Sequence, residues 1–249
     1  LAVLNPAAFL ATMTTRLAIN VLQSARVRRE TYVGPWLPEP VDTNADPYLG
    51  AERGEALEFA ALMLMEKLTP NERAAYVLRE AFDYPYAQIA DILQSSEPAV
   101  RQLVSRARTH VAGQRRTPVT AAAQKELLTT FIAAARSGEM AALERLFAAE
   151  VTSSSDGNGR VRIARRPVVG VTRVAKFLSA ISTWFWDDVD VRWVSTNGQT
   201  SAVIREVGEA GRYAGRDSAV RCVLTVSASA EGIDHVLWMF NPDKITAVS

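Results

Sequence analysis

The sequence of 249 residues lacks the features that mark several large classes of protein. Its single cysteine, Cys222, cannot form an internal disulfide, which excludes a disulfide scaffold and fits a reducing compartment. The chain has no apolar run near the roughly 20 residues that a membrane helix needs, and no basic and then apolar leader. We therefore expect a cytoplasmic protein without membrane contact. Apolar residues make up 48% and charged residues 22%, a globular composition that excludes disorder.

Residues for metal or phosphate chemistry are also scarce. The chain has two histidines, and no group of Cys, His and Asp has the spacing of metal ligands. Gly157 and Gly159 lie in a short polar turn ahead of an expected strand, whereas a phosphate-binding loop precedes a helix. We therefore expect no metal and no cofactor.

Charge is balanced over the whole chain, at a net +1, but it is unevenly distributed. Residues 1–30 carry four arginines against one glutamate, and residues 96–116 carry five arginines against one glutamate. Between them, residues 31–55 carry five acidic side chains against one arginine. Two basic stretches around an acidic connector suggest two contacts with a polyanion, although solvated helix faces give the same pattern.

The chain opens with a predicted helix and a proline-rich segment. Asn5 and Pro6 are a typical helix start, and apolar residues follow at helical spacing through residues 6–30. The next segment, residues 31–53, holds three closely spaced prolines, which exclude helix and central strand. We predict an extended acidic linker in which Trp36 docks on an apolar surface.

A helical cluster is predicted after this linker. Thr69 and Glu72 on either side of Pro70 have the spacing of a capping box at a helix start. Apolar residues at helical spacing predict helices over residues 56–68, 70–82, 86–93 and 99–112. A short helix, a turn and a longer arginine-bearing helix form a helix-turn-helix arrangement.

In the second half of the chain, the sequence pattern changes from helical to strand-forming. After a second linker at residues 114–120, helices come first and strands dominate later, which predicts an α+β domain with antiparallel strands. The expected helices cover residues 121–137, 139–149 and 171–181. The expected strands cover residues 161–163, 189–194, 202–207, 219–227 and 235–240.

One face of the predicted helix over residues 99–112 is polar and basic. Its outward residues are Arg101, Gln102, Ser105, Arg106 and Arg108. Arginine forms paired, charge-assisted hydrogen bonds with phosphate, and a glutamine side chain can read a base edge. The face therefore predicts DNA contact, although a structural helical bundle remains an alternative.

Several of these stretches resemble extracytoplasmic-function sigma factors. The sequence LTPNERAA at residues 68–75, YAQIA at residues 86–90 and the arginines of residues 100–108 resemble region 4 of that family. Residues 6–29 resemble the end of its region 2.

Three further motifs resemble one subgroup of this family, which carries a SnoaL-like domain after region 4. They are GPWLPEP at residues 34–40, DGNGR at residues 156–160 and NPDKI at residues 241–245. Because the three motifs are separated and in order, the resemblance covers essentially the whole chain.

The resemblance implies a multidomain fold, an all-α helix-turn-helix region followed by an α+β SnoaL-like cone domain. The implied parts are a region 2 fragment (1–30), a Pro-rich acidic linker (31–53), region 4 (54–113), a linker (114–120) and a SnoaL-like regulatory domain (121–249).

The resemblance also implies an alternative sigma factor that works with core RNA polymerase on promoter DNA. Region 4 would recognise the minus-35 element, with Gln102 and Ser105 on bases and Arg101 and Arg106 on phosphates. The polymerase-docking and strand-melting parts of region 2 would precede Leu1, so we expect that this chain does not initiate transcription alone.

SnoaL-like relatives include enzymes that cyclise polyketides with an acid–base pair in a cone-shaped pocket. In this chain, His235 neighbours Asp234 on an expected strand, and strand neighbours point to opposite faces. We therefore expect no catalytic residues and no enzyme. The aromatic side chains of the domain fit core packing or a pocket for a small ligand, so an enzyme or a small-molecule sensor on a helical scaffold is the alternative. These side chains are Trp184, Trp186, Trp193, Trp238 and Phe240.

Regulation in cis is the role that we predict for this domain. The residues that we expect to form the regulatory contact are Trp36, Leu37, Pro38 and Glu39 in the linker, Asp156, Gly157, Gly159 and Arg160 in the turn, and Asn241, Pro242, Asp243 and Lys244 in the tail. Arg160 is expected to pair with Glu39 or with a backbone carbonyl. The tail is expected to form an Asx-Pro turn, and it resembles a negative-control element of the subgroup. An ordinary hairpin-like turn at residues 156–160 is the alternative.

Overall fold

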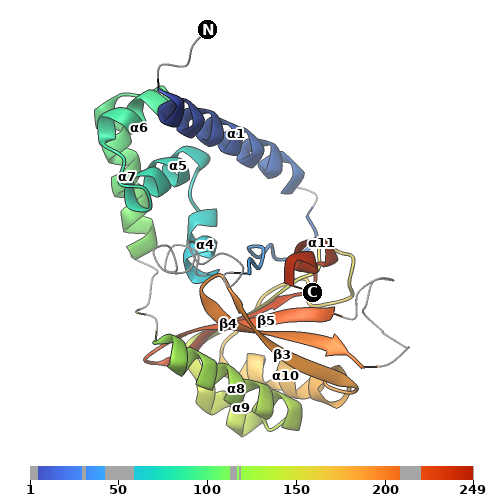
Figure 1. Cartoon of the computed structure of the whole chain (residues 1–249). Coiled ribbons are helices and arrows are strands. Elements are labelled where there is room, and N and C mark those ends of the chain that lie inside the picture. Colours follow the sequence, from blue (N-terminus) through green and yellow to red (C-terminus); the bar gives the residue numbers. More distant parts are fainter. Residues whose placement is uncertain are drawn as a thin grey trace. The chain divides into compact units, whose positions relative to one another are not determined.

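A computed structural model describes residues 5–29, 32–42, 59–112, 117, 119–207 and 220–248. The chain divides into two compact units (Figure 1), of which the first comprises Leu1–Thr31 and Ala60–Arg115 and the second Tyr32–Phe59 and Arg116–Ser249. The described part of the proline-rich linker, residues 32–42, thus belongs to the second unit. Much of both predicted linkers, including residues 43–53 and 114–116, lies outside the described residues.

The described part of the first unit is helical, and short turns join its last four helices. They are α1 (Pro6–Arg29), α4 (Phe59–Glu66), α5 (Pro70–Glu80), α6 (Tyr86–Leu93) and α7 (Glu97–Ala112). The side chain of Thr69 accepts a hydrogen bond from the backbone N–H of Glu72, and the Glu72 carboxylate accepts one from the backbone N–H of Thr69. The predicted capping box is therefore present at the start of α5, where it satisfies two backbone donors that the helix leaves free.

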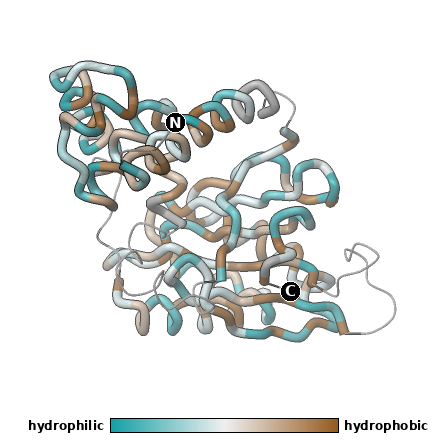
Figure 2. Tube along the Cα trace, turned by 45° about the horizontal axis from the view of Figure 1, so that its top comes forward, coloured by the Kyte–Doolittle hydropathy of each residue, from teal (hydrophilic) through white to brown (hydrophobic). Residues whose placement is uncertain are grey.

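Helix α7 is packed along one side. Hydrophobic and hydrophilic residues alternate every few positions along the helices of this unit (Figure 2). Such alternation is typical of helices that bury one side and expose the other. Val100 and Val104 of α7 join a buried cluster with α5 and α6, and Ala107 and Val111 join a second cluster with α4. Gln94, with a left-handed φ of 53°, ends α6 and turns the chain toward α7. The predicted helix-turn-helix arrangement is confirmed.

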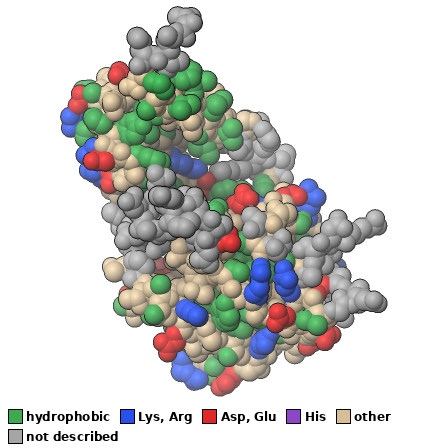
Figure 3. All heavy atoms as spheres, viewed as in Figure 1, with side chains coloured by type: hydrophobic (Ala, Val, Ile, Leu, Met, Phe, Trp, Pro, Cys, Tyr) green, Lys and Arg blue, Asp and Glu red, His purple; other side chains and the backbone are tan. Residues whose placement is uncertain are grey.

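Helix α1 leaves large apolar side chains exposed. The exposed set is Phe9, Leu10, Met13, Leu17 and Val21. Figure 3 shows hydrophobic side chains gathered over this helix. Such a surface is suited to contact with another protein segment.

The second unit combines helices with one sheet. Its helices are α8 (Ala121–Ser137), α9 (Met140–Leu146), α10 (Val171–Phe185) and α11 (Pro242–Ile245), with a 3-10 turn at Thr246–Val248. Its strands are β1 (Phe147–Asp156), β2 (Val168–Val169), β3 (Val189–Thr196), β4 (Gln199–Glu206), β5 (Val220–Ser229) and β6 (Gly232–Met239). The strand order is β2-β1-β6-β5-β4-β3.

The structure around β1 differs from the prediction at the end of one helix, in the pairing of one strand and at residues 161–163. The helix predicted over residues 139–149 ends at Leu146, and the chain continues as β1. Strand β1 pairs in parallel with β6, whereas the other ladders of the sheet are antiparallel, as predicted. The polar run Ser153–Asp156 gives no strand signal in the sequence, but its residues are buried and held by the ladder to β6. Conversely, residues 161–163 form no strand, because they follow the turn after β1 and cross to β2 as a loop.

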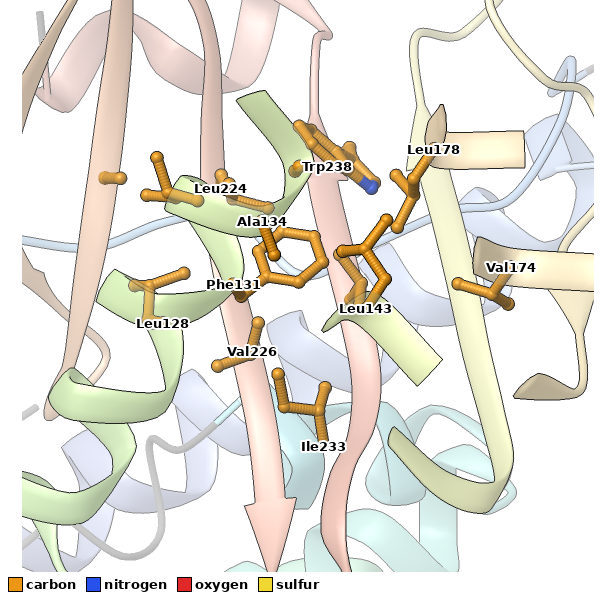
Figure 4. Close-up of a cluster of buried hydrophobic side chains, with 14 of the residues drawn as sticks. Leu128, Phe131, Ala134, Leu143, Val174, Leu178, Leu224, Val226, Ile233 and Trp238 are labelled. Atoms are coloured by element: carbon orange, nitrogen blue, oxygen red, sulfur yellow. The ribbon is translucent and has the colours of Figure 1, made fainter. Parts of the chain in front are cut away.

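The core of the second unit lies between helices and sheet. Figure 4 shows Leu128 and Phe131 of α8 and Leu143 of α9 directed toward Leu224 and Trp238 of the sheet. Trp238 lies 6.2 Å from the ring of Phe131 and 5.4 Å from that of Phe185, edge-on to the latter. This aromatic and aliphatic packing fixes the strand ends that carry Asp156 and the start of the tail motif.

Candidate nucleic-acid interface and linker site

The five residues predicted for DNA contact all lie on the exposed side of α7. We call Arg101, Gln102, Ser105, Arg106 and Arg108 the arginine face. The side chains of Arg101, Arg106 and Arg108 are 58%, 64% and 53% exposed, and Gln102 and Ser105 are also exposed. Since the opposite side of α7 is buried, the helix presents this face to solvent on a rigid support.

The arginines of this face pair with carboxylates of their own unit. Arg106 Nε lies 3.4 Å from Glu72 Oε1, and Arg108 donates from Nη2 to Glu80 Oε1 at 2.8 Å. The hydrogen bond and the charge of Glu80 raise the pKa of Arg108. Exposed ion pairs of this kind contribute only about 0–1 kcal/mol, so phosphate groups can replace the carboxylates at small cost.

Arg101 is positioned by a ring as well as by charge. It pairs with Glu97 one turn earlier on α7, and its guanidinium lies 4.4 Å from the centre of the Tyr86 ring. Tyr86 is the first residue of α6, so the ring comes from the other helix of the helix-turn-helix pair. A cation held over a ring keeps its outer N–H groups free for an anion.

A second site is centred on Asp156, the last residue of β1. Its side chain is fully buried, with 0% exposure, and it collects donors from the linker and from the tail. Asp156 Oδ2 accepts from the Leu37 backbone N–H at 2.9 Å and from Lys244 Nζ at 2.8 Å, while Oδ1 accepts from the Tyr32 hydroxyl. We call Tyr32, Trp36, Leu37, Asp156 and Lys244 the linker site.

Lys244, a residue of the tail, contacts the linker. Its Nζ donates to the Leu37 carbonyl at 2.6 Å as well as to Asp156, and it lies 4.1 Å from the centre of the Trp36 ring. Burial of Tyr32 raises the pKa of its hydroxyl, and the hydrogen bond to Asp156 and the negative charge of Asp156 act in the same direction. The buried carboxylate is thus satisfied by one ammonium and two neutral donors.

The tail motif lies beside the same site, with one difference from the expectation. Asn241 caps α11 through its side chain, which accepts from the Asp243 backbone N–H, and Pro242 is the first helical residue. The expected pairing of Arg160 with Glu39 or a carbonyl is wrong, because Arg160 Nη2 lies 3.0 Å from Asp243 Oδ2. Asp243 stands in the first turn of α11 beside the turn that carries Arg160, whereas the Glu39 side chain is exposed.

The two glycines of the turn hold it against the linker. Gly157 accepts through its carbonyl from the Arg160 N–H at 2.8 Å, which closes the turn. Gly159 has a φ of +70°, and a Cβ added there would lie 3.1 Å from Cβ of Val33. The linker therefore packs on bare backbone at this point.

The sequence did not predict two residues that contact the linker or belong to it, Tyr32 and Asn197. Tyr32 precedes the linker motif, and no signal in the sequence singles it out. Asn197 forms the turn between β3 and β4 with Gly198, and its Oδ1 accepts from the Val41 N–H at 2.9 Å. The Asn-Gly pair predicts a hairpin turn, but not that the turn also binds the linker.

Some features of the described residues concern metal binding, the reactivity of the single cysteine and membrane spanning. They contain no group of three or more His, Cys, Asp or Glu side chains that could hold a metal ion. Burial raises the pKa of the Cys222 thiol, which keeps it protonated and unreactive. No helix among them is both long enough and apolar enough to cross a membrane.

An exposed basic helix braced by its partner helices is the arrangement of a helix-turn-helix DNA-binding protein. Comparison with known proteins agrees: the profile of sigma-70 region 4 matches residues 58–111. ECF RNA polymerase sigma factor SigJ of Mycobacterium tuberculosis (strain ATCC 25618 / H37Rv) is 34% identical over an alignment of 253 residues, which covers 97% of this chain and 79% of that protein. The chain belongs to the ECF RNA polymerase sigma factors.

Further comparisons extend this result. The crystal structure of Mycobacterium tuberculosis SigJ matches with a TM-score of 0.74 and 30% identity, over 99% of this chain and 84% of that one. ECF RNA polymerase sigma factor SigG of the CDC 1551 / Oshkosh strain is 30% identical over 129 residues, or 49% of this chain and 35% of that protein. The predicted family and the predicted fold class, a helical region 4 followed by an α+β domain, are confirmed.

Proposed function

We propose that the first unit recognises the minus-35 promoter element through the arginine face of α7 and that it does so in complex with core RNA polymerase. The observation that carries this proposal is the division of α7 into a buried apolar side and an exposed side of arginine, glutamine and serine. Arg101, Arg106 and Arg108 contact phosphates, and Gln102 and Ser105 contact base edges in the major groove.

Selection of duplexes from a random library tests this function. The whole chain is used alone and with core RNA polymerase, and the bound duplexes are sequenced. We expect enrichment of one short motif and binding that weakens steeply with salt. Enrichment of no motif in either arm contradicts the proposal.

The second unit, in this proposal, is a regulatory domain that acts in cis and has no catalytic role. The linker site supports this regulatory role. Asp156 is fully buried there and accepts hydrogen bonds from Leu37, Tyr32 and Lys244. A domain that holds the linker in this way limits the positions that the DNA-binding unit can take. A small-molecule sensor remains the second candidate, because the same unit contains an apolar cavity.

The substitution Asp156→Asn tests the regulatory role, and Asp190→Asn at an exposed position of β3 is the matched control. The amide keeps the shape of the side chain but loses the charge that holds Lys244. We expect faster hydrogen exchange at the Leu37 amide and a change of at least about threefold in affinity for the selected duplex, a shift of under 1 kcal/mol. Faster exchange with unchanged affinity would show a linker contact without regulation.

A further inference from the structure

The second unit has a cavity of about 270 Å³, open to solvent on one side, between α10, β6 and the loop that follows β1. Its apolar walls are formed by Phe177, Ile181, Trp184, Phe185, Trp238 and Phe240. Ligand pockets span about 300–1,000 Å³, so this cavity suits a small molecule of one or two fused rings.

Three of the five aromatic residues singled out in the sequence line this cavity, and two do not. Trp184, Trp238 and Phe240 line the cavity. Trp186 is buried, edge-on to the ring of Phe185, and Trp193 on β3 is 40% exposed. Trp238 and Phe240 thus belong to the buried core and also form part of the cavity wall, whereas Trp184 is half-exposed.

Two polar side chains interrupt the apolar lining. Ser155 is 6% exposed, and the structure records no hydrogen-bond partner for its Oγ among the described residues. It lies on the same side of β1 as Ser153, whose Oγ accepts from the Trp238 indole N–H, and on the opposite side from Asp156. A buried hydroxyl that lines an apolar cavity is a specific hydrogen-bonding position for a ligand.

Arg162 supplies a positive charge at the cavity. It is exposed, lines the cavity with Ile163 and Ala164, and pairs with no acidic side chain in the part of the chain that the structure describes. An unpaired guanidinium next to aromatic walls favours a ligand that carries a carboxylate, since arginine binds that group through two parallel hydrogen bonds.

We infer that this cavity binds a small aromatic carboxylic acid and that its occupancy is transmitted to the linker. The ring system lies between Phe177, Trp184 and Trp238, and the carboxylate meets Arg162 and Ser155. Binding is reversible, and the ligand undergoes no reaction.

A continuous set of contacts connects the cavity with the linker. Ile163 lines the cavity and packs on Gly157, where an added Cβ would lie 2.7 Å from Ile163 Cδ1. Two residues after Gly157, Gly159 packs on Val33 of the linker. A ligand that fixes the loop at Ile163 therefore also fixes the surface on which the linker rests. This second part of the inference rests on the cis-regulatory role proposed above, whereas ligand binding does not.

Binding is tested on the whole chain with naphthalene-2-carboxylate as the probe and naphthalene-2-carboxamide as its uncharged counterpart. Titrations are followed by the indole N–H resonances in NMR spectra. We expect saturable shifts of the Trp184 and Trp238 resonances, none at Trp193, and binding of the acid at least about tenfold tighter than of the amide.

Three variants locate the binding site. Arg162→Gln is expected to weaken binding of the acid at least about tenfold and to leave the amide unaffected, and Ile181→Trp, which fills the cavity, is expected to abolish binding of both. Arg145→Gln, at an exposed position of α9, is the control and leaves binding unchanged. Absence of saturable binding overturns the inference, as do equal affinities for acid and amide or binding that survives Ile181→Trp.

Transmission is tested by hydrogen exchange at the Leu37 amide, which donates to Asp156. With saturating naphthalene-2-carboxylate we expect exchange at Leu37 to slow at least about threefold, because a loop held by the ligand opens less often. An unchanged rate under saturated indole resonances overturns the transmission. Since neither readout involves DNA, a failure here is separate from a failure of promoter recognition.

Discussion

Asp156 illustrates how a single buried charge can specify the path of a linker. A carboxylate without exposure is costly unless every oxygen is satisfied, and its three donors come from two distant parts of the chain: Tyr32 and Leu37 in the linker and Lys244 in the tail. Leu37 is itself 1% exposed, so apolar burial and hydrogen bonding act at the same place. The linker therefore has one strongly preferred position on the second unit.

Replacement of Lys244 by methionine tests the strength of this arrangement. Lys244→Met retains the aliphatic stem but leaves Asp156 buried without its cation, which we expect to destabilise the second unit by about 3 kcal/mol. All five tryptophans lie in the second unit, so urea unfolding followed by tryptophan fluorescence reports on it alone. Lys125→Met, at an exposed position of α8, is the control, expected within about 0.5 kcal/mol of wild type. A loss at position 244 no larger than at position 125 would contradict the account.

Glu72 gives a pH-dependent test in the first unit. Burial alone would raise the pKa of its carboxyl, but hydrogen bonds from Thr69 and the charge of Arg106 outweigh burial and lower it. A lowered pKa stabilises the fold above the ordinary pKa of glutamate, and this stability is lost as the pH falls through the lowered value.

We therefore expect wild type to lose about 1 kcal/mol more than Glu72→Gln when the pH falls from about 5 to about 3. Thermal unfolding followed by helical circular dichroism measures this difference. Glu126→Gln, at an exposed position of α8, should follow wild type. Parallel pH curves for wild type and Glu72→Gln would show that the carboxylate does not stabilise the helix start.

At the scale of the elements, local signals decide what the sequence can predict. The starts of α5 and α7 carry capping residues, and α6 and α8 have clear apolar spacing, so these helices are predicted close to their observed bounds. Strand β1 is missed because its polar residues are held by pairing with β6, far away in the sequence. The partners of Asp156 and Arg160 depend on the same long-range topology, which residue patterns do not contain.

The two kinds of DNA contact proposed for helix α7, to bases and to phosphates, lead to different predictions. Gln102→Ala is expected to relax the preference at one base-pair position by about 1–3 kcal/mol while the remaining positions keep theirs. Arg101→Gln is expected to weaken binding to all sequences equally, because phosphate contacts carry no base information. Repeated selection from a random duplex library distinguishes the two outcomes. An unchanged base preference with Gln102→Ala would remove this residue from base recognition.

At the scale of the whole molecule, the linker connects the helical unit with the unit for which we propose a regulatory role. Its described residues 32–42 belong to the second unit, although in the sequence they follow a helix of the first. Its path is held at one end by Asp156 and at the other by Asn197, whose side chain accepts from the Val41 N–H. If the second unit releases this segment, a longer stretch of free chain separates α1 from the second unit. The DNA-binding unit can then move over a larger distance.

The central claim is that the arginine face of α7 binds promoter DNA, and charge reversal tests it most directly. The triple variant Arg101→Glu, Arg106→Glu, Arg108→Glu is compared with wild type and with Arg145→Glu on α9, after circular dichroism has shown equal helix content. Binding of the selected duplex is measured by fluorescence anisotropy between about 50 and about 200 mM salt. We predict that the triple variant loses at least about 100-fold in affinity and that its salt dependence falls by about three phosphate contacts, while Arg145→Glu binds as wild type does. Equal affinity and an equal salt dependence for the triple variant and wild type would contradict the account.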